Sequence, residues 1–217
     1  MDFTRSNPTE LNNKEFDLKR STLGAAALLA SAFALPAFAQ GVTAGHPYIG
    51  AAGGGSHLNG GCAAGISCNN NDTAWKIYGG WTIPGDFAAE LTYYDLGKFS
   101  AAAPGSNVGA SLRGTYWGFG GAWLPQFGTS GWGAAVRVGA AYGEGKLDVS
   151  GFGSETRNDW HPYGGLGVSY AFSKNVKVEA DWDWTKIGSQ FTDPGTGITQ
   201  KGTDTAQTYM IGATYTF

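Results

Sequence analysis

The chain has 217 residues, of which 36 are glycine and 14% are charged, and its formal net charge is −3 at pH 7. Glycine is far above its usual share of about 7%, but no G-x-y period accompanies it, which excludes collagen. Aromatic residues make up 14% of the chain and argue against a disordered glycine-rich tract. Without a basic excess, no nucleic-acid partner is expected. So little charge with a mean hydropathy of −0.19 fits neither an ordinary soluble protein nor a helical membrane protein, so we expect β-structure at a membrane.

The first 39 residues contain the parts of a secretory signal peptide. Lys19 and Arg20 precede a short apolar run, residues 24–35, which ends before an A-x-A pattern at residues 37–39. The run is too short for a helix to cross a ~30 Å hydrocarbon core, which needs about 20 residues. We predict a signal peptide over residues 1–39, cleavage after Ala39, and a β-barrel domain over residues 40–217.

Cys62 and Cys68 are the two cysteines of the chain. In the oxidising compartment that export implies, such a local pair favours a disulfide that closes a loop, with free thiols as the alternative. A metal site is disfavoured because no second cysteine pair and no suitably spaced histidines follow. We predict a Cys62–Cys68 disulfide and no metal site.

A two-residue alternation of apolar and polar side chains predicts eight strands. They are residues 47–55, 73–83, 87–96, 110–124, 131–142, 159–172, 176–186 and 205–217. The short connections are residues 84–86, 125–130 and 173–175, and the long ones are residues 56–72, 97–109, 143–158 and 187–204. All the long connections therefore fall at one end of an up-and-down meander.

The two faces of most predicted strands differ in residue type. In residues 176–186, one face carries Val176, Val178, Ala180, Trp182 and Trp184, and the other carries Lys177, Glu179, Asp181, Asp183 and Thr185. Across the strands, the polar face is mostly small residues with few charges. It is too sparse to coat a soluble, lipocalin-like barrel, but it suits a narrow interior. Because only a closed sheet satisfies every backbone group in lipid, we predict an all-β, eight-stranded antiparallel up-and-down transmembrane β-barrel.

Three stretches resemble one known family. Residues 74–81 and 90–97 are similar to strands two and three of the OmpA-like outer-membrane β-barrel family. Residues 208–217, with alternating aromatics before Phe217, resemble the assembly signal of bacterial outer-membrane proteins. The resemblance implies the bacterial outer membrane, periplasmic termini and outward-facing long loops. It also implies a barrel without a peptidoglycan-binding domain, an assembly signal that includes Tyr215 and Phe217, and outer-membrane lipid and the barrel-assembly machinery as partners.

Six charged residues on the predicted inward face lie around the middle of the barrel. They are Lys76, Glu90, Arg137, Glu179, Asp181 and Asp183. Eight strands leave an interior just filled by side chains, so a wide porin channel is not expected. One interpretation is a network of ion pairs that plugs the barrel, because unpaired buried charges cost several kcal/mol each. The other is a gate or a narrow cation-preferring pore. OmpA-like barrels carry such interior ionic networks, so the resemblance supports both.

The histidines do not indicate an enzyme. They are His46, His57 and His161, and His161 shares a predicted face with Ser169. These two residues are eight positions apart, about 26 Å of extended strand, which is too far for a base and its nucleophile. We predict no catalytic residue and no cofactor. The expected role is structural or surface-interactive, with an extracellular ligand or a host surface as candidate partners of the four long loops. A narrow channel for ions or small solutes, gated by the interior charges, is the alternative.

Overall fold

The computed structural model describes residues 45–60, 65–102 and 109–217, which belong to one compact unit. The strands within this part of the chain are β1 (Pro47–Asn59), β2 (Ser67–Asn69), β3 (Asn71–Ile83), β4 (Phe87–Ala102), β5 (Gly109–Trp123), β6 (Trp132–Val149), β7 (Gly153–Ala171), β8 (Val176–Thr192) and β9 (Thr199–Thr216). Over these residues, no helix has the length and apolar character needed to cross a membrane. The predicted signal peptide and Cys62 lie outside the described residues.

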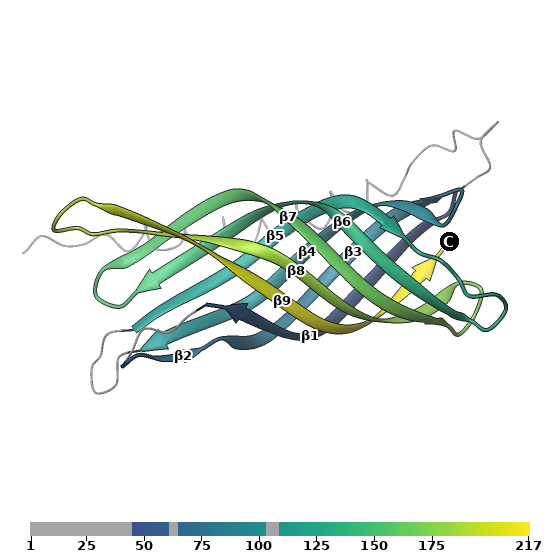
Figure 1. Cartoon of the computed structure of the whole chain (residues 1–217), viewed down its shortest axis with the longest axis horizontal. Helices are drawn as coiled ribbons and strands as arrows, with labels where there is room; N and C mark the ends of the chain where they lie inside the picture. The colour runs from purple at the N-terminus through teal and green to yellow at the C-terminus, as the bar shows by residue number, and fades with distance from the viewer. Residues whose placement is uncertain (1–44, 61–64, 103–108) are drawn as a thin grey trace, which may run out of the picture. The chain divides into compact units, whose positions relative to one another are not determined.

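Eight of the strands close into a ring (Figure 1). The order is β4-β3-β1-β9-β8-β7-β6-β5, β5 pairs back with β4, and every pairing is antiparallel. The predicted eight-stranded antiparallel up-and-down barrel is confirmed. The short strand β2, which pairs with the C-terminal end of β4, lies in the predicted loop 56–72 and was not foreseen.

The register of the pairs fixes the tilt of the strands. A path through paired residues that leaves β7 at Trp160 and crosses the other seven strands returns to β7 at Tyr170, ten residues further on. For eight strands with a rise of ~3.3 Å per residue and a spacing of ~4.8 Å, this displacement corresponds to a tilt of about 40°.

Several strands extend further at one end than the alternation predicted. Most of the predicted connections 143–158 and 187–204 is paired β-ribbon, with turns only near residues 150–152 and 193–198. These segments are rich in Gly, Ser and Thr and carry no apolar alternation, because neither face is covered by lipid. Their backbones still pair across each hairpin. The predicted boundaries were therefore too short at this end, where the hairpins project from the ring (Figure 1).

The outer face of the ring carries large apolar side chains bounded by aromatic residues. On β6 and β7, Trp132 pairs with Tyr170 near one end, and Tyr142 pairs with Trp160 ten residues away. At a tilt of ~40°, ten residues span about 25 Å along the barrel axis, which matches the apolar band of a transmembrane β-barrel. The outer face is thus a lipid-facing surface with an aromatic girdle at each edge.

A β-bulge interrupts β4 just beyond one girdle, between Asp95 and Lys98. Gly97 has a φ of 80°, and a Cβ atom there would lie 2.5 Å from the backbone oxygen of Thr73, so glycine alone fits without strain. The carboxylate of Asp72 on β3 accepts hydrogen bonds from the backbone N–H groups of Thr73 and Lys98. The bulge sets Lys98 opposite Arg113 of β5.

Candidate functional site

All six predicted inward-facing charges lie inside the ring, and each is at least 96% buried. The β-strand alternation accounts for their direction, since successive side chains point to opposite faces of the sheet. On β8 it places Glu179, Asp181 and Asp183 inward, while Trp182 and Trp184 between them face the lipid. The structure therefore brings together carboxylates from β4 and β8 with cations from β3 and β6.

Arg137 is the centre of this network. Its guanidinium donates from Nε to Glu90 Oε1 at 3.1 Å, from Nη1 to Asp181 Oδ1 at 2.9 Å and from Nη2 to Glu179 Oε2 at 2.7 Å. One planar cation thus satisfies three carboxylates that reach it from two strands, and its fixed fork of donors suits this arrangement.

Lys76 forms the second half of the network. Its Nζ lies 2.9 Å from Asp181 Oδ2 and 2.7 Å from Asp183 Oδ2. Asp181 therefore bridges the two cations, with one oxygen on Lys76 and the other on Arg137. Asp183 Oδ1 has no hydrogen-bond partner among the described residues.

Further residues that were not among the predicted site residues join the network, among them Thr92, which donates to Glu90 Oε1 at 3.2 Å, and Tyr94, which accepts from Lys76 Nζ at 3.5 Å. Tyr48 donates to Glu90 Oε2 at 2.9 Å, Thr214 donates to Glu179 Oε1 at 2.8 Å, and the Tyr78 hydroxyl lies 2.8 Å from Thr214 Oγ1. Lys177 Nζ lies 3.3 Å from Glu179 Oε1 and adds a third cation. Lys177 and Thr214 were visible on polar strand faces, whereas the Gly- and Ala-rich strand around Tyr48 gave no face assignment.

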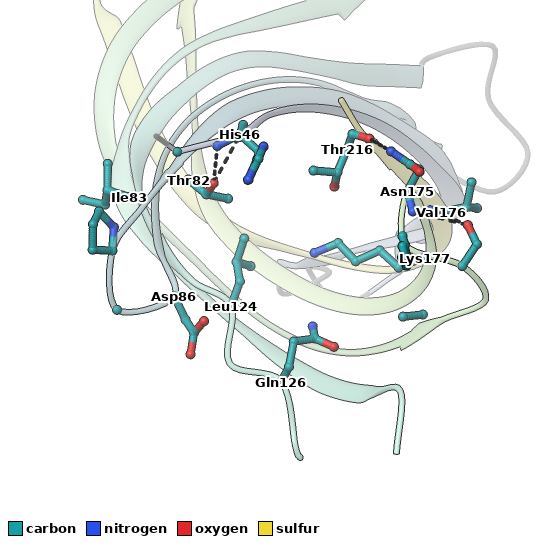
Figure 2. A pocket seen from close by; sticks show the side chains of 16 residues that line it. His46, Thr82, Ile83, Asp86, Leu124, Gln126, Asn175, Val176, Lys177 and Thr216 are labelled. Atoms are coloured by element: carbon teal, nitrogen blue, oxygen red, sulfur yellow. Dashed lines mark hydrogen bonds between the residues drawn. The ribbon is translucent and has the colours of Figure 1, made fainter. Parts of the chain in front are cut away.

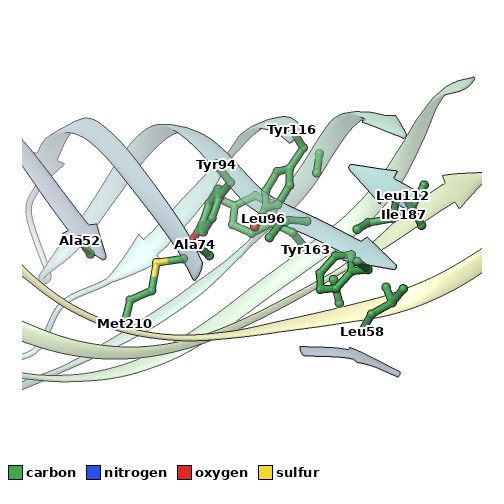
Figure 3. Packing of buried hydrophobic residues seen from close by; sticks show 13 residues of the cluster. Ala52, Leu58, Ala74, Tyr94, Leu96, Leu112, Tyr116, Tyr163, Ile187 and Met210 are labelled. Carbon is green, nitrogen blue, oxygen red and sulfur yellow. The ribbon is translucent and has the colours of Figure 1, made fainter. Parts of the chain in front are cut away.

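A cluster of buried hydrophobic residues packs inside the ring beside and beyond the charged layer (Figure 3). Tyr94 and Tyr116 stack with ring centroids 4.3 Å apart, and Ile187 of β8 packs among the buried residues further along. A Cβ atom at Gly145 would overlap the backbone oxygen of Gly188, so the missing side chain lets β8 lean across β6. The cluster comprises Ala52, Leu58, Ala74, Tyr94, Leu96, Phe99, Leu112, Tyr116, Ala141, Tyr163, Ile187, Ala206 and Met210.

The opposite end of the ring, where the short turns lie, is hollow (Figure 2). A cavity of about 600 Å³ opens between the turns at residues 84–86 and 173–175, and Lys177 and Gln126 are among its lining residues. None of the six network residues lines this cavity. From this end, the interior therefore consists of an open cavity, a charged layer and a hydrophobic cluster in succession.

The fold agrees with the family to which the sequence is matched. The model of the outer membrane protein beta-barrel domain family matches residues 25–217. This chain belongs to that family. The resemblance to OmpA-like barrels is thereby confirmed, and the chain is a β-barrel of the bacterial outer membrane.

Solved structures share the fold of this outer-membrane barrel at low sequence identity. Ail, the attachment invasion locus protein of Yersinia pestis, is 16% identical, with a TM-score of 0.50 over 81% of this chain and 100% of that chain. The N-terminal β-barrel domain of Pseudomonas aeruginosa OprF is 13% identical, with a TM-score of 0.50 over 80% of this chain and 99% of that chain. A search of curated proteins finds no match. The likeness to these structures shows the fold alone.

On the side of the charged layer where the long hairpins project, β7 and β8 of the outer-membrane barrel are no longer joined by backbone hydrogen bonds. We call this gap in the ladder the seam. Their backbone ladder ends at the pair Gly164 and Trp184. Pro162 lies just beyond this pair and has no N–H that could continue the backbone ladder. Its carbonyl accepts a hydrogen bond from the Thr185 hydroxyl instead. Arg157 was expected in an outer loop, which was wrong: it lies on β7 and donates to the carbonyls of Ser189 and Gly202. Side chains thus hold the two hairpins together here.

The remaining predicted residues lie away from the network. Cys68 lies on β2 opposite Ala101, while Cys62 is outside the described residues, so their disulfide stays a prediction. Tyr215 faces outward and its ring lies 5.1 Å from that of Phe217.

His161 and Ser169 both lie on β7, eight residues apart, as the spacing implied. Within the described ranges, no group of three His, Cys, Asp or Glu residues could hold a metal ion.

Proposed function

We propose that this outer-membrane barrel is a sealed scaffold with a structural or surface-interaction role. The observation that supports it is the buried ionic network, in which Arg137 and Lys76 form ion pairs with carboxylates of β4 and β8 at the middle of the ring. The side chains of the six charged residues that form these ion pairs are each at most 1% exposed. A water-filled pore would need these charges to be hydrated, which the burial does not favour.

The free energy needed to separate the buried ion pairs favours a closed plug over a gate that opens spontaneously. Removing one partner from a buried ion pair costs about 3–5 kcal/mol, because it leaves a charge without compensation. Opening a pore at this level would separate several such pairs at once. The apolar layer around Ile187 adds a second barrier to ions.

We further infer the orientation and the route of the chain. Residues 1–39 act as a signal peptide cleaved after Ala39, and both termini face the periplasm. Tyr215 and Phe217 belong to the signal read by the barrel-assembly machinery. The projecting hairpins β6–β7 and β8–β9 then face the outside, where an extracellular ligand or a host surface is their partner. No catalytic role is proposed.

Conductance in planar lipid bilayers tests the sealed interior. The folded wild-type protein is expected to give no steady single-channel current, and Lys174→Gln, in an exposed periplasmic turn, is expected to behave in the same way. A steady cation-preferring current through the wild-type protein would overturn the plug and favour the narrow channel. Arg137→Ala then reports on the network, since a gate made of these charges would conduct more after its loss.

Labelling of intact cells tests the orientation. In a background with Cys62→Ser and Cys68→Ser, Thr196→Cys places a thiol in the turn between β8 and β9. A membrane-impermeant maleimide is expected to label it in intact cells, whereas Lys174→Cys is expected to react only after the outer membrane is permeabilised. The reverse pattern would show that the hairpins face the periplasm.

A further inference from the structure

We propose that the outward end of the barrel interior binds a small amphipathic amine, a ligand that carries a protonated amino group on an apolar ring. The site is a pocket inside the ring beyond the charged layer. We call it the mouth pocket, and its lining includes Leu58, Phe99, Leu112, Leu147 and Asp204. The proposal specifies a ligand for the surface-interaction role and rests on the outward orientation of the long hairpins given above. None of the six network residues lines this pocket.

The apolar side chains of the mouth pocket can enclose one ring. Leu58, Phe99 and Leu112 come from three strands, belong to the hydrophobic cluster of the interior and are each at most 8% exposed. The pocket has a volume of about 180 Å³, and apolar cavities of about 150 Å³ take up benzene. Ala101 and Ala110, which are direct partners on β4 and β5, line it with small side chains that leave this space open. The ligand therefore binds in a pocket whose inner end is closed by the hydrophobic cluster.

One carboxylate of the mouth pocket has no partner. Asp204 of β9 is the only charged residue among the described residues that line the pocket. It lies on the inward face of its strand, because Ala206 and Thr208, two and four residues further on, are buried inside the ring. Over the part of the chain that the structure describes, Asp204 makes no hydrogen bond and no ion pair. A protonated amine has three N–H donors and no acceptor, so it can supply the charge-assisted hydrogen bond that this carboxylate lacks.

The charges around the pocket favour a cation over an anion. Lys98 and Arg113 are neighbours in sequence of Phe99 and Leu112, but the strand alternation turns them to the exposed outer face. Their cationic groups therefore do not line the pocket. An anionic ligand would meet Asp204 without a compensating cation, and a neutral ligand would not gain the charge-assisted bond. An ammonium group gains this bond while the rest of the ligand contacts the apolar side chains.

The mouth pocket lies outside the hydrocarbon layer. Tyr209 faces the lipid on β9 and pairs with the outward-facing Trp182 of β8. Asp204 lies five residues beyond Tyr209 toward the projecting hairpins, which is about 13 Å along the barrel axis at ~3.3 Å per residue and ~40° of tilt. A water-soluble amine therefore reaches the carboxylate from the aqueous side without entering the lipid.

Backbone amide NMR of the folded protein in nanodiscs of zwitterionic lipid tests the site. The probes are phenethylamine, phenethyl alcohol and hydrocinnamate, which share a phenyl ring on a two-carbon chain and end in an ammonium, a hydroxyl and a carboxylate group. The amides of Gly60, Ala101 and Ala110, which line the pocket, report binding. Asp204→Asn removes the charge, and Asp148→Asn, which removes an exposed carboxyl of β6, is the matched control. Ala110→Leu fills the pocket without changing charge. Heat-modifiable gel migration verifies that each variant is folded.

The expected result is that phenethylamine shifts the pocket amides saturably and binds Asp204→Asn roughly tenfold more weakly than the wild type and Asp148→Asn, as for the loss of one charge-assisted contact. Phenethyl alcohol should bind the wild type about as weakly as phenethylamine binds Asp204→Asn. Hydrocinnamate should not shift these amides, and Ala110→Leu should not bind phenethylamine.

Equal binding of phenethylamine and phenethyl alcohol by the wild type, or unchanged binding of the amine by Asp204→Asn, overturns the proposal. Equal binding by Ala110→Leu shows that the amine lies elsewhere, as after partition into lipid, and also overturns it. Binding in nanodiscs does not depend on orientation in the cell, so a negative result leaves the labelling and conductance results unaffected. A reversed labelling pattern would instead contradict the proposed function and leave the measured affinity for the amine as it is.

Discussion

At the scale of single residues, Arg137 forms ion pairs with more buried carboxylates than any other side chain described. It holds Glu90, Glu179 and Asp181 together, and its own side chain is 1% exposed. Its planar guanidinium cannot be replaced by a point charge without the loss of at least one of these bonds.

Arg137→Ala is therefore expected to lower the free energy of unfolding by about 3–5 kcal/mol, because three buried carboxylates lose their shared partner. Urea unfolding in lipid vesicles measures it. Lys174→Ala is the control and should change stability by less than about 0.5 kcal/mol. Arg157→Ala is not a neutral control, because Arg157 bonds two backbone carbonyls across the seam. Equal stability of the Arg137 and Lys174 variants would contradict the network as a source of stability.

Asp72, which lies outside the membrane-spanning segments, should make the stability of the barrel depend on pH. Hydrogen bonds from the backbone N–H groups of Lys98 and Thr73 lower the pKa of this carboxyl from its ordinary value of 3.8. A carboxyl whose folded pKa is depressed adds stability above its unfolded pKa, and loses it as the pH falls through the folded value. The stability difference between the wild type and Asp72→Asn should thus be constant above about pH 5 and shrink below about pH 4.

Urea unfolding of both proteins between pH 3 and pH 7 measures this difference. Asp148→Asn, which removes an exposed carboxyl of β6, serves as the matched control. A difference for Asp72→Asn that stays constant down to pH 3 would mean that the carboxylate does not hold the bulge.

At the scale of elements, the bulge in β4 decides which residues face outward beyond the girdle. Gly97→Ala should destabilise the barrel by roughly 1–3 kcal/mol, since a side chain at this positive φ is strained and meets the Thr73 carbonyl. Gly121→Ala is the control, because a Cβ atom there meets only the Ala88 oxygen at 3.9 Å. Thermal or urea unfolding of the two variants compares them, and equal losses would argue against strain at the bulge.

Strands β7 and β8 show which features the alternation of side chains could predict and which it could not. The alternation in β8 predicted the inward direction of Glu179, Asp181 and Asp183, because lipid on one side forces a strict apolar face. It could not predict the extent of β7, where Arg157 lies above the membrane and no apolar face is required. Nor could it predict that β8 leans inward at Ile187, since this depends on glycines of two other strands, Gly114 of β5 and Gly145 of β6, that leave room for it.

At the scale of the whole molecule, the proposed assembly signal lies in a lipid-facing row. Tyr215 and Phe217 extend the outward row of β9, and Phe217 is 59% exposed. Phe217→Ala should reduce the amount of folded, heat-modifiable protein in the outer membrane, because the assembly signal proposed above loses an aromatic residue. Ile211→Ala, in the same row and also exposed, is the control. An unchanged yield of folded protein for Phe217→Ala would contradict its part in the signal.

The closure of the ring also has a consequence for the order of folding. The ladder between β1 and β9 joins Tyr48 to Thr216, residues at almost opposite ends of the described chain. The cost of closing so long a loop grows with its length, and contacts this distant in sequence make folding slow. Every hairpin can form locally, but the ladder between β1 and β9 can form only after β9 has been synthesised and exported. Until then, two strand edges and the unpaired carboxylates stay open to water, so a translation product that stops before β9 should remain unfolded in the periplasm and be degraded there.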